Sequence, residues 1–119
     1  MKAITLHRVV EELGLEVRAG KENLGREVSG GYACDLLSDV MAHAEEGNIW
    51  VTTQAHQNIV AVATLVGLSG VVVTGGATIE PEAIEKADRE GIPLLATKLP
   101  TFEVVGRLYA LGVRGGWRD

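Results

Sequence analysis

Three short apolar runs, each followed by a stretch with helical spacing, constrain the fold of this chain more than any other feature. The runs occupy residues 49–52, 70–74 and 92–97 and are rich in Val, Ile and Leu. Short runs of this kind are typical of strands buried on both faces of a sheet. Strands that alternate with helices favour right-handed crossovers and a parallel sheet. The pattern predicts an α/β fold, a single three-layer domain with a mainly parallel sheet and helices on both faces.

The first part of the chain predicts a short helix and two further strands. Residues 6–13 have the spacing of an amphipathic helix, and Thr5 can cap it. Residues 15–19 alternate between apolar and polar side chains, which indicates a half-buried strand. Residues 26–29 are predicted as a second strand that ends at the two glycines after Ser29.

The remaining helices are placed by their capping residues and their composition. Asp35 is a plausible cap for a helix over residues 36–44, and Pro81 suits the first position of another. The helix from residue 54 or 55 to 67 is apolar on every side except its first turn, which predicts a buried helix with a polar end. Thr101 is expected to cap the last helix. The inward face of that helix is predicted to hold Phe102, Val105, Leu108 and Tyr109.

Length and charge exclude several classes of function. A chain of 119 residues suits one domain, and its net charge of −5 disfavours binding to nucleic acid or to an anionic membrane. Cys34 is the single cysteine, so no intramolecular disulfide can form, and an inert apolar role is more common for it than a reactive thiol. The histidines are too scattered for a metal spacing, and we expect no cofactor. Without a signal peptide's apolar run or a spanning segment, we expect a cytoplasmic protein.

The candidate binding site lies where the three predicted strands end, because ligands bind outside the carboxyl ends of parallel strands. Each run ends in a threonine and is followed by a polar or glycine loop. Hydroxyls, free backbone N–H groups and helix N-termini there suit a phosphate or carboxylate, with Lys98 as the only nearby fixed cation. Threonines that merely end strands and cap helices explain the pattern equally well. The candidate residues are Thr52, Thr53, Gln54, His56, Asn58, Thr74, Gly75, Gly76, Thr97, Lys98 and Thr101.

His56 is the one candidate for acid–base chemistry. No carboxylate adjoins it in sequence to orient the ring, so a polar surface position is the more common outcome. No phosphate-binding P-loop, dinucleotide fingerprint or Ser–His–Asp constellation is present. We therefore expect no catalytic residues and no enzymatic activity.

The order of these segments resembles the DRTGG domain. The resemblance is carried by residues 71–76, then a helix that starts at proline, then residues 91–97 with the Gly-Ile-Pro-Leu-Leu-Ala-Thr sequence, then Thr101-Phe102. Residues 91–97 also resemble the N-terminal domain of HPr kinase/phosphorylase, which is related in fold. The core of the resemblance covers residues 24–111, so residues 1–23 are interpreted as an N-terminal extension and residues 112–119 as a tail.

One half of the family motif is missing. The Thr-Gly-Gly half stands at Thr74, Gly75 and Gly76, but the family's Asp-Arg pair is replaced by neutral residues in the segment 54–58. If that pair serves a ligand or an interface in the family, this chain does so differently or not at all. We expect the difference between this protein and its relatives to lie between these two loops.

The resemblance implies a stand-alone, non-catalytic regulatory module that pairs with itself as a homodimer or higher oligomer. We expect it to sense a small anionic ligand, such as a nucleotide. The alternative is a pure interaction module that docks on a metabolic enzyme or on itself, with Trp50, Trp117 and Tyr109 as exposed anchors. A small enzyme that uses His56 is a third hypothesis, ranked last because no nucleophile is identifiable.

Overall fold

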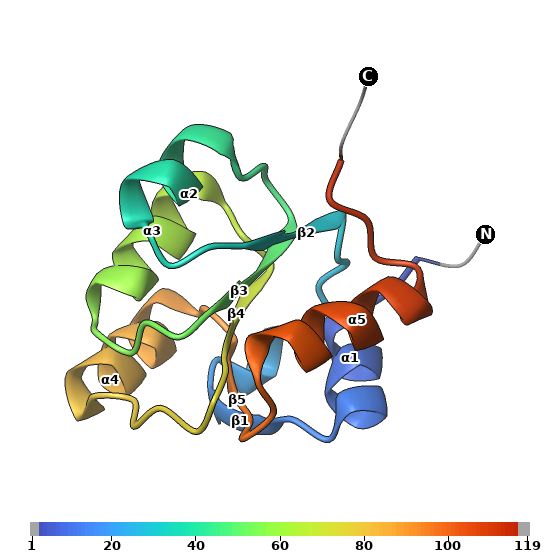
Figure 1. Ribbon diagram of the computed structural model, residues 1–119. Helices are drawn as coiled ribbons and strands as arrows, with labels where there is room; N and C mark the ends of the chain where they lie inside the picture. Colours follow the sequence, from blue (N-terminus) through green and yellow to red (C-terminus); the bar gives the residue numbers. More distant parts are fainter. Residues whose placement is uncertain (1–2, 117–119) are drawn as a thin grey trace.

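A five-stranded sheet lies between two layers of helices in the computed structural model, which describes residues 3–116 (Figure 1). The strands follow the order β1-β5-β4-β3-β2 across the sheet. Strands β2 to β5 are parallel to one another, whereas the edge strand β1 runs antiparallel to β5. The strands are β1 (Glu16–Ala19), β2 (Gly30–Ala33), β3 (Asn48–Thr52), β4 (Gly70–Val73) and β5 (Leu94–Ala96).

The helices divide between the two faces of the sheet. One face is covered by α2, α3 and α4, and the opposite face by α1 and α5 (Figure 1). This arrangement confirms the predicted α/β class, the mainly parallel sheet and the helices on both faces. The helices are α1 (Leu6–Leu13), α2 (Leu37–His43), α3 (Asn58–Val66), α4 (Pro81–Glu90) and α5 (Thr101–Leu111), with a short 3₁₀ helix, η1 (Lys21–Asn23).

The two central strands supply both halves of the core. Val71 and Trp50 pack toward α2, α3 and α4, whereas Ile49, Val51 and Val72 pack toward α1 and α5. All five side chains are at most 1% exposed. Fully burying one such aliphatic side chain stabilises the fold by about 1.5–3 kcal/mol. The uninterrupted apolar run in β4 thus serves two cores at once, and the loop that follows it emerges at the carboxyl edge of the sheet.

Two predicted helix starts are confirmed. The Thr5 hydroxyl accepts a hydrogen bond from the backbone N–H of Arg8 at 3.3 Å, as an N-cap does. Pro81 occupies the first turn of α4, where the N–H that proline lacks would have no partner within the helix.

The second predicted strand is wrong. In the segment 26–29, Glu27 makes only an isolated bridge to Thr5, and β2 instead begins at the glycines expected to end that strand. β2 pairs in parallel with β3, and the Gly31 N–H donates to the carbonyl of Arg114 at 3.0 Å on its other side. A Cβ on Gly30 would lie 2.8 Å from that same carbonyl oxygen. The glycines are therefore strand residues that let the C-terminal segment approach β2.

Several predicted side-chain positions are also wrong. Trp50, expected to be exposed, is fully buried, while Trp117 lies outside the described residues. On α5, Phe102 is 90% exposed and the inward positions are Val104 and Leu108. α3 begins later than predicted, at Asn58. Its Leu65 is 73% exposed, so the helix is not buried on every side as predicted. The inward-facing sides of α3 and α5 depend on which strands they cross, which the helical spacing alone left open.

Candidate functional site

A cavity of about 630 Å³ opens at the carboxyl end of β5, beside the edge strand β1. Its walls come from the C-terminal end of α1, the β4–α4 loop, the β5–α5 loop and one side of α5. Three cationic side chains line it, Arg18 from β1, Lys98 from the β5–α5 loop and Arg107 from α5. The carboxyl edge of a parallel sheet is the usual place for a ligand, so this cavity is the candidate site.

Two of the three cations have a carboxylate beside them. Arg18 Nε lies 3.2 Å from Glu16 Oε1, and Arg107 Nε lies 3.6 Å from Glu103 Oε2. Lys98 forms no ion pair with another residue in the described range 3–116. Ion pairs between partly exposed side chains are weak, and a guanidinium binds a doubly charged phosphate more strongly. The cavity can therefore offer positive charge to an anion although the whole chain has a net charge of −5.

The glycine turn after β4 borders the cavity, but its amides are occupied. Gly75 and Gly76 have φ angles of +69° and +70°, the left-handed region where a side chain would be strained. The Gly75 N–H donates to the carbonyl of Leu99 at 2.8 Å, and the Gly76 N–H donates to that of Thr97 at 3.0 Å. The expectation that free backbone N–H groups here would hold an anion is wrong. The turn instead fastens the β4–α4 loop to the β5–α5 loop.

The threonines that end the strands are also engaged internally. Thr74 is fully buried, and its hydroxyl lies 2.6 Å from that of Thr101. Thr101 is the first residue of α5 and not its N-cap, which is Pro100, so the predicted cap is wrong. The Thr97 hydroxyl accepts from the Leu99 N–H at 3.1 Å and shapes the loop. The hydrogen bonds of these hydroxyls are made within the protein and hold the loops that form the cavity wall.

A second polar cluster forms at the end of β3, around Asp35. Its Oδ1 accepts from the Thr52 hydroxyl and from the Thr53 N–H, both at 2.7 Å, and the Gln54 side chain donates to the Asp35 carbonyl at 3.0 Å. The bonds to the carboxylate, that from the Thr53 N–H first and then that from the Thr52 hydroxyl, hold the pKa of Asp35 below its usual range, although desolvation opposes them. Asp35 was predicted to cap α2, but that helix begins at Leu37 with Leu36 as its N-cap. Asp35 instead connects the β2–α2 and β3–α3 loops.

His56 lies at the start of α3 and is held from two sides. Its Nδ1 accepts from the Asn58 N–H at 3.1 Å, which leaves the proton of the neutral ring on Nε2. Nε2 lies 3.7 Å from the Glu80 carboxylate, the orienting group that adjacent sequence did not supply. The Glu80 N–H also donates to the Ala55 carbonyl at 3.1 Å. The two loops that carry the retained and the lost halves of the motif are therefore directly joined.

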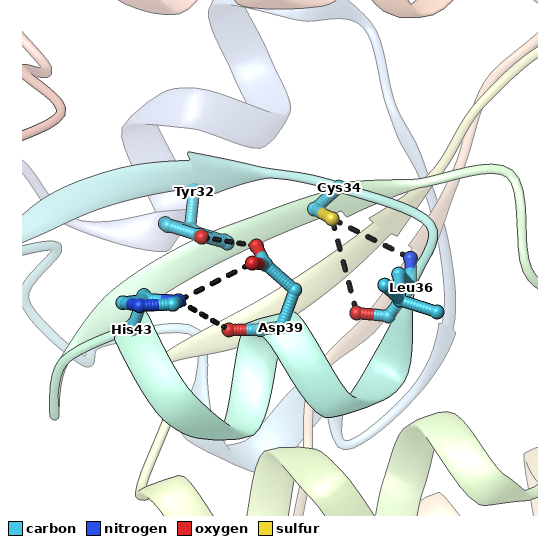
Figure 2. A network of polar contacts seen from close by, with 5 residues as sticks. All are labelled: Tyr32, Cys34, Leu36, Asp39 and His43. Atoms are coloured by element: carbon cyan, nitrogen blue, oxygen red, sulfur yellow. Dashed lines mark hydrogen bonds and ion pairs between the residues drawn. The ribbon is translucent and has the colours of Figure 1, made fainter.

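A third polar cluster connects β2 to α2 (Figure 2). The Tyr32 hydroxyl donates to the Asp39 carboxylate, whose other oxygen lies 3.2 Å from His43 Nδ1. The bond to Asp39, with burial and the negative charge of Asp39 adding to it, raises the pKa of Tyr32 from 10.0 to about 12. The Cys34 Sγ accepts from the Leu36 N–H at 3.4 Å. This cluster fastens α2 to the sheet and shares no residue with the cavity beside β5.

The structure thus divides the predicted site residues into groups. Gly76, Thr97 and Lys98 meet in the cavity, while the other candidates form the clusters above or lie beside them. Arg18 and Arg107, which complete the cavity, were missed, so Lys98 is not the only nearby cation. The alternation of residues 15–19 predicted the strand that carries Arg18, but only the pairing of β1 with β5 brings it to this edge.

Within the described range, no helix is long and apolar enough to cross a membrane. Over the same residues, no group of three or more His, Cys, Asp or Glu side chains is arranged to hold a metal ion. The predicted cytoplasmic location stays a prediction.

Known structures show the same fold. The chain is similar to the crystal structure of the CBS and DRTGG domains of the regulatory region of Clostridium perfringens pyrophosphatase, complexed with its activator diadenosine tetraphosphate. The match has a TM-score of 0.72 and 21% identity, and it covers 87% of this chain and 45% of that one. At this identity the similarity establishes the fold alone. No curated protein matches the sequence.

The sequence comparison identifies the family. The DRTGG domain, as a family model, matches residues 8–111, which is most of the chain and includes most of α1 and all of β1 as well as the segments that carried the resemblance. The retained Thr74-Gly75-Gly76 turn occupies the end of the central strand β4, fastened to the loop after β5. This chain belongs to the DRTGG domain family.

Proposed function

We propose that this chain is a non-catalytic regulatory domain that senses a small anionic ligand, such as a nucleotide, in the cavity beside β5. The observation that carries the proposal is the convergence of Arg18, Lys98 and Arg107 from three separate elements on one cavity. Glu16 is the one carboxylate among the cavity's lining residues, so positive charge prevails there. Because the rest of the chain is acidic, a cluster of cations in one cavity makes that cavity the favoured place for a phosphate to bind.

The size and walls of the cavity suit a ligand of that class. Its volume of about 630 Å³ falls within the range of small-molecule sites. Leu13, Leu99 and Pro100 add apolar surface on which a base or sugar can pack. A family member whose regulatory region was crystallised with diadenosine tetraphosphate supports a nucleotide as the first ligand to test.

The proposal is tested by isothermal titration calorimetry and thermal unfolding with ATP, diadenosine tetraphosphate and inorganic pyrophosphate as probes. A ligand at 100 times its Kd should stabilise the protein by about 2.7 kcal/mol. We expect Lys98→Gln and Arg18→Gln each to weaken binding roughly tenfold, since each removes a charge-assisted hydrogen bond. Added salt should weaken binding further.

Lys86→Gln on α4 is the matched control, because it removes the same charge away from the cavity. Unchanged binding in the control with weakened binding in the two cavity variants supports the site. No binding of any of the three probes would contradict the proposed ligand class. Binding that is equally insensitive to Lys98→Gln and Arg18→Gln would contradict the location.

Self-association is the second candidate function, and one observation favours it. The outer face of α5 exposes Phe102 by 90% and Tyr109 by 59%. Exposed aromatic side chains on one helix face are characteristic of protein interaction surfaces. Sedimentation velocity over a range of concentrations tests whether the partner is another copy, and co-purification from cells tests a metabolic enzyme. A strict monomer without partners would contradict this candidate.

A further inference from the structure

The outward face of α5 carries an apolar stripe. Phe102, Gly106 and Tyr109 follow one another at spacings of four and three residues, which places them on one side of the helix. Val104 and Leu108 point the other way, into the core that α5 shares with α1. Phe102 and Gly106 are exposed on this side of α5, whereas the Tyr109 ring, although 59% exposed, packs against the Arg114 guanidinium, which lies 3.7 Å from the ring centroid.

Gly106 lies in the middle of this stripe and has no explanation within the chain. Its φ angle is not positive, and a Cβ added there would meet no atom outside its own helix within 4 Å. Glycine inside a helix is less favourable than alanine, since it gains more conformational freedom on unfolding. A glycine on an exposed helix face does, however, let a second helix approach the backbone closely.

From this arrangement we propose that α5 docks on α5 of a second copy of this chain, antiparallel, with a two-fold axis beside Gly106. The inference deepens the self-association candidate above by naming its surface and symmetry. An isologous contact requires a patch that is complementary to itself. The two sides of the stripe meet this requirement in different ways.

One side pairs aromatic rings. Along the helix, Phe102 lies about 6 Å before Gly106, and Tyr109 lies about 4.5 Å after it. An antiparallel two-fold therefore brings Phe102 of one copy beside Tyr109 of the other, twice. Aromatic pairs of this kind contribute beyond the area that they bury.

The other side pairs opposite charges. Glu103 lies about 4.5 Å before Gly106, and Arg107 lies about 1.5 Å after it, on the flank opposite the two aromatic rings. The same two-fold brings Glu103 of one copy within reach of Arg107 of the other, so the ion pair now formed within each helix can be shared between copies. A parallel two-fold would instead set the flank that carries Glu103 and Arg107 in each copy against the aromatic flank of the other, so neither charge would meet its opposite across the contact. Charge thus favours the antiparallel dimer.

The area available sets the expected strength. Phe102 and Tyr109 are 90% and 59% exposed, and aromatic side chains bury roughly 150–250 Å² each. Even with Val105 and Ala110 added, the stripe supplies less than the roughly 800 Å² per partner of a standard interface. We therefore expect a dimer that forms with rising concentration and not a permanent one.

Sedimentation velocity from ~1 µM to ~1 mM measures this equilibrium. We expect Phe102→Ser and Gly106→Glu to weaken dimerisation at least tenfold. Leu65→Ser is the matched control, since Leu65 is a similarly exposed apolar side chain on α3, on the other face of the sheet. Glu103→Arg should also weaken the dimer, and the charge exchange Glu103→Arg with Arg107→Glu should restore it. Circular dichroism confirms that each variant stays folded.

Cross-linking tests the symmetry directly. In a Cys34→Ser background, Gly106→Cys should form a covalent dimer under mild oxidation, because a two-fold beside residue 106 brings its two copies together. Leu65→Cys serves as the control for random collision. Equal cross-linking of the two variants would overturn the proposed axis.

The outcomes separate the two levels of the proposal. A monomer at every concentration overturns both this inference and the self-association candidate. A dimer that is unaffected by Phe102→Ser and Gly106→Glu overturns the α5 surface alone and leaves self-association through another face. Neither result depends on anion binding, because all measurements are made without added ligand.

Discussion

The hydroxyls of Thr74 and Thr101 lie 2.6 Å apart and join the end of the central strand to the first turn of α5. The Thr74 hydroxyl also lies 3.4 Å from the carbonyl oxygen of Thr52, so it can donate there and accept from Thr101. Because Thr74 is fully buried, its hydroxyl has no access to water as a substitute partner, whereas Thr101 is half-buried. The contact holds α5, and with it Arg107, in place beside the cavity.

Replacing Thr101 by valine should destabilise the protein by about 1–3 kcal/mol, because the Thr74 hydroxyl would lose its short hydrogen bond inside the fold. Thr101→Ser keeps the hydroxyl and should stay close to the parent. Urea unfolding monitored by circular dichroism gives both values. Equal stability of the valine and serine variants would show that the hydroxyl pair contributes nothing.

Asp35 should make stability depend on pH in the acid range. Its folded-state pKa is held low, first by the Thr53 N–H and then by the Thr52 hydroxyl. The stabilisation is therefore complete above the unfolded value of about 3.9 and is lost as the pH falls through the folded value. Urea unfolding between about pH 3 and pH 7 measures the free energy of unfolding at each pH. This free energy should fall less steeply toward low pH in Asp35→Asn than in the parent.

Glu85→Gln is the control for this measurement, since Glu85 is an exposed carboxylate on α4. The free energy of unfolding of Glu85→Gln should fall with pH as steeply as that of the parent. An Asp35→Asn variant whose stability falls as steeply as that of the parent would place the responsible carboxylate elsewhere.

Tyr32 should remain protonated until unusually high pH. The bond to Asp39 raises its pKa to about 12, so the stabilisation from this bond is complete below pH 10.0 and is lost as the pH rises toward 12. Ultraviolet titration of tyrosinate in a Tyr109→Phe background isolates Tyr32. Asp39→Asn should move the midpoint down toward the ordinary tyrosine value, whereas Glu12→Gln on α1 should leave it unchanged.

His56 should contribute to stability through its ring nitrogen, although the N-cap of α3 is Gln57. The Nδ1 of His56 accepts the Asn58 N–H at the start of α3, so His56→Ala should cost about 0.5–1.5 kcal/mol, as the loss of one hydrogen bond does. His56→Asn retains an acceptor and should recover most of that loss. Thermal unfolding of the three proteins compares them. If His56→Ala were as stable as the parent, the hydrogen bond would contribute nothing to folding, and a role of His56 in ligand binding would become the better explanation.

Much of the fold could be predicted from local pattern. The uninterrupted apolar run at residues 70–73 and the two similar runs beside it indicated buried parallel strands, and Pro81 marked the start of its helix. Their threonine ends placed the candidate site at the carboxyl edge, where Gly76, Thr97 and Lys98 do meet. These features follow from nearest neighbours in the sequence, because side-chain burial and helix starts are encoded over a few residues.

Long-range pairing decided what the local pattern could not. Arg18 reaches the cavity only because β1 pairs antiparallel with β5, and the Gly75 and Gly76 amides are occupied only because the β5–α5 loop lies against them. The face that α5 turns inward, and hence the exposure of Phe102, depends on the strands beneath it. The sequence by itself determined the α/β class, the family and the sheet edge that holds the cavity. The tertiary structure decided which charges and which apolar side chains share a surface, since such contacts join residues far apart along the chain.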